Sequence, residues 1–385
     1  MNKEKGRVPK LRFPGFTEDW EQRKLGDITK TNPFKSYLSN ALEIGKYEVI
    51  QQGEIPIAGY ADGIPCYNYE NITIFGDHTL SLFKPNKPFF ISSDGVKLLS
   101  PLVKIDGQFF YYLLEKYKPK SEGYKRHFTI LKNCEAYFPN NIEEQTKIST
   151  LLNRINSIIT LHQRKLEHLN LKKKALLQKL FPKNGERYPE IRFPGFTDAW
   201  EQRKLGDLAE IVRGASPRPI SDPKWFDNNS KVGWLRIADV TAQDGRIRYL
   251  EQKISELGQE KTRVIKTPHL LLSIAATVGK PVINYVPTGV HDGFLIFLNP
   301  KFNILFTFWW LEMFREKWNK YGQPGSQVNL NSDLVKNQVI NIPNEKEQEE
   351  ISSFLEALDK IITLHQRKLE HLQLQKKALL QQMFV

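Results

Sequence analysis

The sequence predicts a mixed α+β protein in which two globular α/β domains are joined by two long antiparallel coiled-coil helices, with a pseudo-two-fold repeat. Three observations predict this architecture. Two blocks of sequence occur twice in nearly the same letters, each half carries a long apolar stripe with helical spacing, and the segments between the blocks contain short β-rich runs. A repeat of this length sets the number of structural units before any other feature is considered.

The chain of 385 residues is long for one compact domain and sufficient for two. Hydrophobic residues make up 40% and aromatic residues 11%, so each half can bury a core and a disordered chain is excluded. Lys and Arg outnumber Asp and Glu by 56 to 43, which gives a net charge of +13. An excess of this size favours a polyanionic partner, with nucleic acid first and an anionic membrane surface second.

The membrane alternative is the weaker one. The opening residues MNKEKGRVPK contain no apolar core of a secretory signal, and the longest apolar stretches, 270–278 and 304–314, are much shorter than the roughly 20 residues of a spanning helix. Cys66 and Cys134 are too few for a disulfide framework or a CxxC zinc site, and they are expected to be buried small residues. We therefore expect a soluble, cytoplasmic protein with no membrane partner.

The repeated blocks alternate with divergent inserts. Residues 9–27 read PKLRFPGFTEDWEQRKLGD and residues 189–207 read PEIRFPGFTDAWEQRKLGD, while 158–169 and 361–372 both read IITLHQRKLEHL. Between these blocks the two halves are nearly unrelated. The order of block, insert, helix, block, insert, helix predicts a pseudo-two-fold ring that is cut open at one place, with the C-terminus leading back toward the N-terminal block.

Each repeated helix carries an apolar seam whose spacing alternates between four and three residues, which indicates a coiled coil rather than an ordinary surface helix. Two stripes of matched length are expected to pack on each other, antiparallel because a complete insert lies between them. Pairing of each helix in a homodimer is the alternative. The first seam is Ile148, Leu152, Ile155, Ile159, Leu166, Leu169, Leu176 and Leu180, and the second is Ile351, Leu355, Leu358, Ile362, Leu369, Leu372, Leu379 and Met383.

The inserts are predicted to be mixed α/β because β-branched and aromatic runs alternate with Gly, Pro and Asn turns. A helix is expected near the end of each insert, at about 106–118 and 302–320. The expected strands are 47–50, 72–75, 79–83 and 89–91 in the first insert, and 232–237, 270–275, 281–286 and 294–298 in the second.

Motifs of catalysis are absent. Neither GxxxxGK[ST] nor GxGxxG occurs, Asn32-Pro33-Phe34 lacks the second proline of the NPP[YF] motif of amino-methyltransferases, and residues 93–97 lack the ExK of a nuclease and are typical of a turn. His162 and His365 each have a second histidine six positions on, unlike the i, i+4 pair of a zinc site. Both histidines interrupt the seams, so they are predicted to fix the helix register, and no metal is expected.

Basic and amide side chains on loops are candidates for DNA contacts, because Lys and Arg neutralise phosphates and Arg, Gln and Asn read base edges. An ordinary polar turn is the alternative for each loop. The three lysines at 172–174 could likewise touch phosphates or an acidic partner, or form a solvated face. The loop candidates are Lys125, Arg126 and His127 in the first insert and Arg213, Ser216, Arg218, Gln323, Ser326, Gln327 and Asn329 in the second.

This layout resembles the specificity (S) subunit of a type I restriction–modification enzyme. In the second insert, residues 234–239, 270–279 and 325–330 also resemble that family, whereas 59–69 and 124–132 of the first match loosely. The resemblance adds Tyr60, Asp62, Arg236, Thr277 and Lys280 to the candidate DNA contacts. It rests on Phe13-Pro14-Gly15-Phe16, Trp20 and Leu25-Gly26-Asp27, on their copies Phe193-Pro194-Gly195-Phe196, Trp200 and Leu205-Gly206-Asp207, and on Pro139, Glu144-Gln145, Pro343 and Glu347-Gln348.

The resemblance implies a division into four segments. Residues 1–147 would be the N-terminal frame block with target recognition domain 1, and 148–181 the central conserved helix. Residues 182–346 would be the linker, second frame block and target recognition domain 2, and 347–385 the C-terminal conserved helix. Each target recognition domain would read one half of a bipartite site in double-stranded DNA.

The resemblance also implies the partners. The helices, with the seam residues and His162 and His365, would form a frame that docks two modification (methyltransferase) subunits, and restriction subunits would complete the nuclease. The S subunit itself is non-catalytic and binds no cofactor, and S-adenosylmethionine is expected on the modification subunits. A helix over 148–180 spans roughly 50 Å, on the order of 15 base pairs, so the coiled coil is expected to set the spacer between the half-sites.

Two other functions stay open from the residues alone. One is a two-domain coiled-coil scaffold that binds acidic partners without reading a sequence. The other is a self-sufficient DNA methyltransferase or nuclease, against which the absence of a cofactor-binding motif argues.

Overall fold

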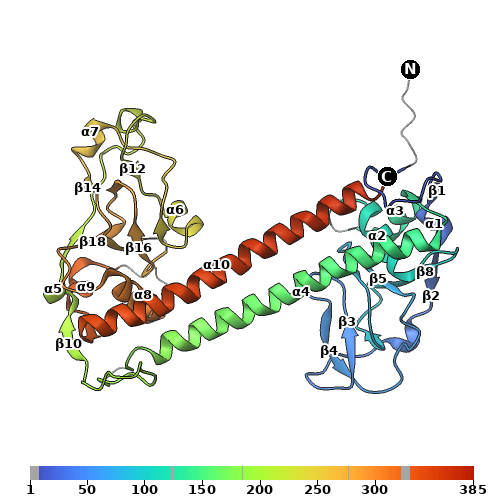
Figure 1. Ribbon diagram of the computed structural model, residues 1–385, viewed down its shortest axis with the longest axis horizontal. Coiled ribbons are helices and arrows are strands. Elements are labelled where there is room, and N and C mark those ends of the chain that lie inside the picture. Colours follow the sequence, from blue (N-terminus) through green and yellow to red (C-terminus); the bar gives the residue numbers. More distant parts are fainter. Residues whose placement is uncertain (1–7, 122, 124, 184, 276, 322–329) are drawn as a thin grey trace. The chain divides into compact units, whose positions relative to one another are not determined.

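The computed structural model describes residues 8–121, 123, 125–183, 185–275, 277–321 and 330–385 (Figure 1). The chain divides into two compact units: unit 1 is Met1–Arg164 with Gln366–Val385, and unit 2 is Lys165–His365. This division cuts both long helices, α4 (Ile142–Lys179) and α10 (Glu345–Gln382). Each unit is therefore built from one frame block, one insert and a part of each long helix.

Unit 1 contains a four-stranded sheet, a three-stranded sheet and a two-stranded ribbon. Its short helices are α1 (Leu25–Ile28), α2 (Gly107–Tyr117) and α3 (Phe128–Asn133), with a 3-10 turn at Lys35–Tyr37. Its strands are β1 (Glu21–Lys24), β2 (Thr29–Asn32), β3 (Tyr47–Ile50), β4 (Ile57–Ala61), β5 (Thr73–Gly76), β6 (Leu82–Phe83), β7 (Phe89–Ile91), β8 (Val96–Pro101) and β9 (Glu135–Phe138). The sheet orders are β2-β8-β5-β6, β4-β3-β7 and β1-β9.

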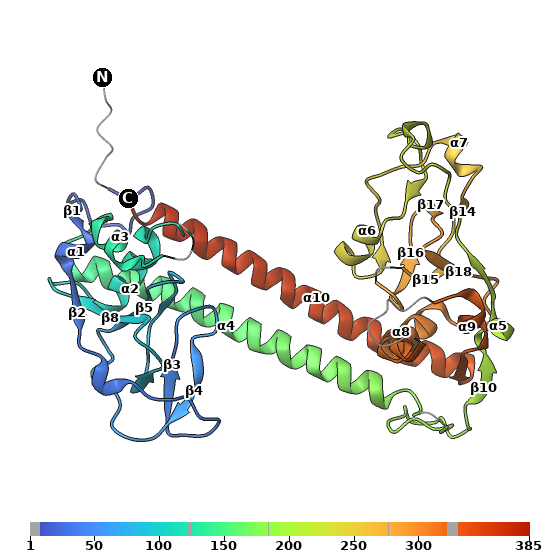
Figure 2. The same ribbon diagram turned by 180° about the vertical axis from the view of Figure 1, so that it is seen from behind.

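Unit 2 repeats the ribbon and adds a larger sheet (Figure 2). Its helices are α5 (Leu205–Leu208), α6 (Ile237–Ala242), α7 (Glu256–Gln259), α8 (Ile304–Phe314) and α9 (Ser332–Asn337), with 3-10 turns at Pro223–Trp225 and Arg315–Tyr321. Its strands are β10 (Glu201–Lys204), β11 (Glu210–Arg213), β12 (Gly233–Trp234), β13 (Arg246–Ile247), β14 (Arg263–Ile265), β15 (Leu270–Ser273), β16 (Pro281–Asn284), β17 (Thr288–Val290), β18 (Phe294–Leu298) and β19 (Val339–Ile342). The sheet orders are β11-β18-β15-β16-β13, β12-β17-β14 and β10-β19.

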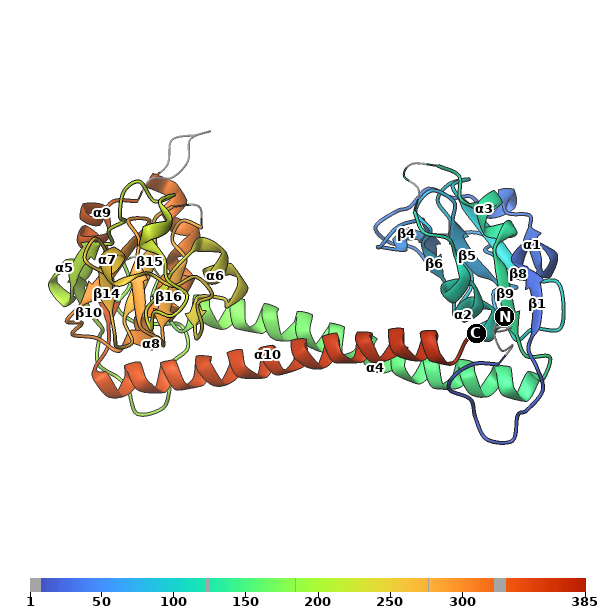
Figure 3. The same cartoon turned by 90° about the horizontal axis from the view of Figure 1, so that it is seen from above.

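In each unit one insert helix packs between the main sheet and a long helix. In unit 2, Phe306 and Trp309 of α8 share a core with Leu272 of β15 on one side and Leu355 of α10 on the other. In unit 1, α2 does the same against α4 (Figure 3). The hydroxyl of Tyr112 on α2 donates to Asn153 Oδ1 on α4 at 2.7 Å. The long helices are thus continuous with the cores of the domains they carry.

An asparagine caps the start of each long helix. Asn141 Oδ1 accepts from the backbone N–H of Glu143 at 2.8 Å, and Asn344 Oδ1 accepts from Glu347 N–H at 3.0 Å. Such a side chain satisfies one of the backbone donors that a helix start leaves unpaired. The first long helix therefore begins at Ile142, ahead of the first apolar seam residue from which its start was predicted.

The seams of α4 and α10 pack on each other within the chain, as predicted. In unit 2, Leu169 packs with Leu358 and Ile362, and Lys173 Nζ donates to Asp359 Oδ1 at 2.5 Å. In unit 1, the other ends of the helices share a core that contains Ile148, Leu152, Leu379 and Met383. Residue numbers rise along one helix as they fall along the other, so the pairing is antiparallel. Every predicted seam position, His162 and His365 included, is buried or half-buried.

The repeated FPGF…W block fastens onto the entry of a long helix. In unit 1, Arg12 forms a bidentate ion pair with the buried carboxylate of Glu144, and Trp20 Nε1 donates to the same carboxylate at 3.4 Å. In unit 2, Arg192 and Glu347 form the same pair. Each copy of the block therefore makes the same arginine–glutamate contact with the start of a long helix.

The same block also receives the end of a long helix, so the C-terminus leads back to the N-terminal block as the repeats predicted. The N–H of Leu11 donates to the carbonyl of Gln382 in unit 1, and the N–H of Ile191 donates to Lys179 in unit 2. An aromatic residue follows each helix end and packs on the block's tryptophan: Phe384 on Trp20 at 5.9 Å between centroids, and Phe181 on Trp200 at 6.3 Å.

Most predicted insert elements form, but two of the expected strands are reduced to two residues. Only Leu82–Phe83 of the expected strand 79–83 is extended, because Leu80 adopts a positive φ of 57°. Of the expected strand 232–237 only Gly233–Trp234 pairs, because Asp239 accepts from the backbone N–H of Arg236 and starts α6. Among the residues that the structure describes, no helix is both long and apolar enough to cross a membrane.

Candidate nucleic-acid interface

Several of the predicted DNA-contact residues of unit 2 gather around Asp292, in the turn that leads into β18. Asp292 Oδ1 accepts from Ser216 Oγ at 2.6 Å, and Asp292 Oδ2 accepts from Arg218 Nη2 at 3.1 Å. Arg213 Nε donates to the main-chain carbonyl of Asp292 at 2.6 Å. The hydrogen bond from Ser216, helped by the nearby charge of Arg213, holds the pKa of Asp292 below its usual value, so the carboxylate is ionised at neutral pH.

A pocket of about 730 Å³ opens beside this turn. Its walls are largely apolar, from Ile220, Trp234 and Ile237, and its polar groups come from Ser216, Arg218, Arg236, His291 and Asp292. Apolar walls with a few convergent polar groups are typical of recognition pockets.

His291 lies between the aromatic wall and the turn. Its ring centroid is 4.8 Å from that of Phe294 and 5.9 Å from that of Trp234. Burial lowers the pKa of His291, so the ring is neutral at pH 7. Its Nδ1 accepts from the N–H of Gly293 at 2.9 Å, which assigns the ring proton to Nε2.

Other predicted residues of unit 2 are held by acidic partners. Arg236 pairs with Asp239 through Nε at 3.0 Å and Nη2 at 2.9 Å, which raises the pKa of Arg236 above its usual value. Lys280 is 12% exposed and its ammonium lies 2.6 Å from carboxylate oxygens of both Asp244 and Glu312. Burial therefore corrects the expectation for Lys280: its charge is neutralised inside the domain and is not presented to DNA.

The remaining predicted contact residues of unit 2 fall into two groups. Thr277 Oγ1 donates to Ser273 Oγ at 3.3 Å, next to the end of β15. Gln323, Ser326, Gln327 and Asn329 lie outside the described residues.

In unit 1 the candidates lie on two separate segments. Tyr60 is on β4 and 37% exposed, and Asp62 follows it and accepts from the N–H of Lys46 at 3.0 Å. Lys125 and Arg126 are exposed just before α3. His127 is fully buried, and its N–H donates to the carbonyl of Asp77 at 2.8 Å. Its burial removes His127 from the side chains that could reach DNA, contrary to the prediction.

The lysines at 172–174 also differ in their surroundings. Lys173 pairs with Asp359 and lies 4.8 Å from the centre of the Trp309 ring, so its charge serves the helix pairing. Lys174 is 68% exposed, and its ammonium lies 3.9 Å from a carboxylate oxygen of the exposed Glu316.

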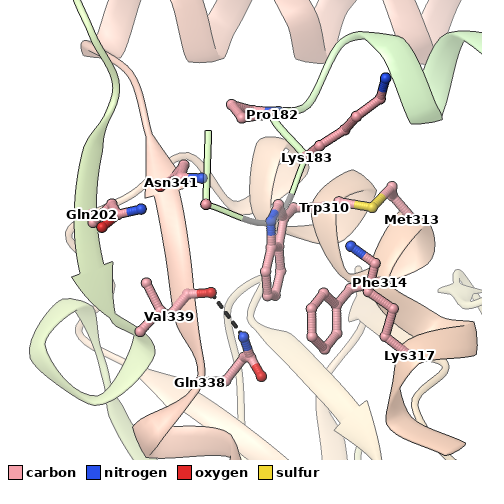
Figure 4. Close-up of a pocket in the computed structure, with 11 residues that line it drawn as sticks. Pro182, Lys183, Gln202, Trp310, Met313, Phe314, Lys317, Gln338, Val339 and Asn341 are labelled. Carbon is pink, nitrogen blue, oxygen red and sulfur yellow. Dashed lines mark hydrogen bonds between the residues drawn. The ribbon is translucent and has the colours of Figure 1, made fainter. Parts of the chain in front are cut away.

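A second pocket, of about 260 Å³, lies in unit 2 where the chain leaves α4 (Figure 4). The rings of Trp310 and Phe314 stack 4.7 Å apart along it, and Gln338 Nε2 donates to the carbonyl of Val339 at 2.9 Å. None of the predicted DNA-contact residues lines this pocket.

Sequence reasoning missed Trp234, His291 and Asp292. The signal that could have found them is a second internal repeat: Asp292-Gly293 precedes β18 as Asp94-Gly95 precedes β8. Within the described part of the chain, no group of three or more His, Cys, Asp or Glu side chains is arranged to hold a metal ion. Cys66 is buried and Cys134 half-buried, and burial raises the pKa of both thiols.

Known proteins share this arrangement. The family described as "Type I restriction modification DNA specificity domain" matches the chain twice, over residues 17–171 and 197–374. The chain belongs to this family, and its two matches coincide with the two frame-and-insert repeats.

Individual relatives are similar over nearly the whole chain. The type I restriction enzyme MjaVIII specificity subunit of Methanocaldococcus jannaschii is 23% identical, covering 96% of this chain and 92% of the relative. The S subunit of a type I restriction–modification system from M. genitalium has the same fold, with a TM-score of 0.64 at 15% identity, covering 98% of this chain and 99% of that one. A chain from a study of complex assembly and conformational transition of the type I R-M system gives a TM-score of 0.56 at 16% identity, covering 97% and 98%.

Proposed function

We propose that this chain is the non-catalytic DNA-recognition subunit of a type I restriction–modification complex, and that each insert reads one half of a bipartite site in duplex DNA. One observation carries the proposal: a single repeated frame holds two inserts with unrelated sequences, one of which presents arginines around a recognition pocket. Two unrelated readers on equivalent supports would read two different half-sites. The net charge of +13 supplies the sequence-independent attraction to the DNA backbone.

The long helices support docking of two copies of one partner. In unit 1, Ile158, Leu161 and Leu374 are 43%, 67% and 65% exposed. Unit 2 carries the same triplet at the repeated positions, listed here with their exposure: Ile361 at 45%, Leu364 at 67% and Leu171 at 69%. The contact between Lys173 and Asp359 places Leu171 level with Ile361 across the antiparallel pair.

Apolar side chains exposed at the same positions of two repeats are typical of a surface that binds another protein. An exposed leucine contributes no burial to the stability of its own helix pair, so its repetition needs a partner to explain it. Two identical triplets would bind two identical subunits, here the modification subunits, each with its own S-adenosylmethionine. Restriction subunits would then join this core. We further infer that α4 and α10, which both extend from one unit into the other, set the spacer between the half-sites, and that the complex works in the cytoplasm where it meets DNA.

The test is to co-express the chain with its modification subunit in a methylation-free host and to map modified adenines genome-wide. We expect two short half-motifs separated by a fixed gap, with one methylated adenine on each strand. A soluble complex that leaves the genome unmethylated would instead support a scaffold that binds acidic partners and reads no sequence.

A binding measurement separates these two outcomes further. Specific binding to the mapped duplex should survive excess competitor DNA and weaken steeply with salt on a log–log plot, because phosphate contacts release counterions. A scaffold without sequence recognition would lose the labelled duplex to the competitor.

A further inference from the structure

The two inserts share one corner although their sequences diverge. In the ladder that joins each insert to its frame block, Lys30 of β2 pairs with Ser100 of β8, and Glu210 of β11 pairs with Leu298 of β18. Asp94 precedes Ser100 by the same number of residues as Asp292 precedes Leu298, so the two Asp-Gly dipeptides stand at equivalent positions before β8 and β18.

A pair of backbone hydrogen bonds confirms that the two turns are equivalent. The N–H of Asp77, which follows β5, donates to the carbonyl of Gly95, and the N–H of Ile274, which follows β15, donates to the carbonyl of Gly293, both at 2.9 Å. The same dipeptide therefore occupies the same structural position in two inserts that otherwise share little.

In unit 2 the loop after β11 is pinned against this turn. The N–H of Gly214 donates to Phe294 and the N–H of Ala215 to Val290, at 2.9 and 3.0 Å. A side chain at position 214 would place its Cβ 2.1 Å from the carbonyl oxygen of His291, so only glycine permits this approach. The loop thus brings Ser216 and Arg218 to the Asp292 carboxylate.

The bonds of Asp292 leave part of the arginine free to recognise a ligand. Arg218 is 81% exposed and uses only Nη2 toward Asp292, so other guanidinium N–H groups point to solvent at the rim of the pocket. Arginine is the commonest reader of a guanine edge, and its planar donors must meet the base acceptors at a fixed angle, so a carboxylate that holds the guanidinium favours such a contact.

We propose that this corner is the base-reading site of each insert: Asp292 is a positioning residue that aims Ser216 and Arg218 at the edge of a DNA base pair, and Asp94 takes the equivalent place in the first insert. The inference rests on the proposed function and refines it, because it assigns the reading of each half-site to one turn. The Asp94 side chain is exposed, so its carboxylate is accessible at the equivalent turn.

The experiment compares the methylation motifs of variants of the intact complex. Asp292→Asn and Arg218→Ala should each reduce discrimination by about tenfold or more at the same position of one half-site, while the other half-site and the spacer stay unchanged. Asp94→Asn should alter only the opposite half-site. Glu260→Gln, an exposed carboxylate at the end of α7 of the same insert, is the matched control and should keep the wild-type motif.

A structural effect of Asp292→Asn would show as a lower Tm with an unchanged motif. That result, together with an unchanged motif for the exposed Arg218→Ala, would overturn the inference. It would also be overturned if Asp292→Asn and Asp94→Asn changed the same half-site. Failure of the wild-type complex to methylate any bipartite site is a different result, since it refutes the proposed function itself.

Discussion

Arg12 and Glu144 are joined by two parallel hydrogen bonds, Nε to Oε1 at 2.7 Å and Nη2 to Oε2 at 2.9 Å. The glutamate side chain is 1% exposed and the arginine 13%. Arg192 and Glu347 form the same pair in unit 2, at 2.7 and 2.8 Å. A buried carboxylate has lost its hydration, so removal of its arginine leaves most of that desolvation cost uncompensated. These two pairs therefore fasten each frame block to the start of a long helix.

Arg12→Ala should lower the free energy of unfolding by about 3 kcal/mol, because it strands the buried Glu144 charge. Arg192→Ala should have an effect of the same size, since the geometry is repeated. The measurement is urea denaturation of the purified complex. Arg23→Ala is the control: its ion pair with Glu21 is surface-exposed, and its loss should cost less than about 1 kcal/mol. Equal effects of Arg12→Ala and Arg23→Ala would show that the buried pair is no anchor.

Insertion of one heptad into both long helices should lengthen the DNA spacer and leave both half-motifs intact. The insertion must fall within 160–175 of α4 and at the facing part of α10, because Lys173 lies opposite Asp359 and a one-sided insertion would slip the seam. Genome-wide mapping of methylated adenines reads the result. A changed half-motif with an unchanged spacer would refute the assignment of the spacer to the helices.

The frame was predictable from the sequence because its rules are local. Alternating spacing of four and three residues defines a coiled-coil seam, and residues such as Leu152 and Leu355 are fully buried. The repeats also predicted that the C-terminus returns to the N-terminal block, and Phe384 packs on Trp20 there.

The candidate interface was less predictable, because its partners are far apart in sequence. Arg213, Ser216 and Arg218 were proposed from their loop alone, yet Asp292, which holds them, is absent from that loop. His127 follows two exposed basic residues, but contact with Asp77, distant along the chain, buries it. Local composition cannot show which charges a distant carboxylate will neutralise.

Replacement of residues 28–142 by a different target recognition domain should replace one half-motif and keep the other. The expectation follows from the frame, because the ion pair of Arg12 with Glu144 and the seam lie outside the exchanged segment. The chimaera is assayed by methylation mapping beside the parent. If both halves change together, the inserts do not read DNA independently.

Leu161→Lys and Leu364→Lys should each remove one bound modification subunit, and the double variant should remove both. Each leucine is 67% exposed, so a charge there should change the free energy of unfolding by less than about 0.5 kcal/mol while it disrupts an apolar contact with a partner. Native mass spectrometry of the assembled complex counts the subunits. Exposed polar positions on the same helices supply the control, for example Gln163→Lys. Full occupancy in the double variant would place the docking surface elsewhere.

The titration of Lys84 should raise the free energy of unfolding as the pH rises from about 8 toward 10.5. Burial lowers the pKa of Lys84 to about 8, and its ammonium donates to the carbonyls of Ile72, at 3.0 Å, and Glu70. Between about pH 8 and 10.5 the unfolded chain binds a proton that the folded chain has released, so the free energy of unfolding increases with pH there. Lys84→Met lacks this titration, so the stability difference between wild type and variant should grow by on the order of 2 kcal/mol across that window. Denaturation curves at several pH values measure it. A constant difference between wild type and Lys84→Met would mean that the buried lysine keeps its proton up to its ordinary pKa.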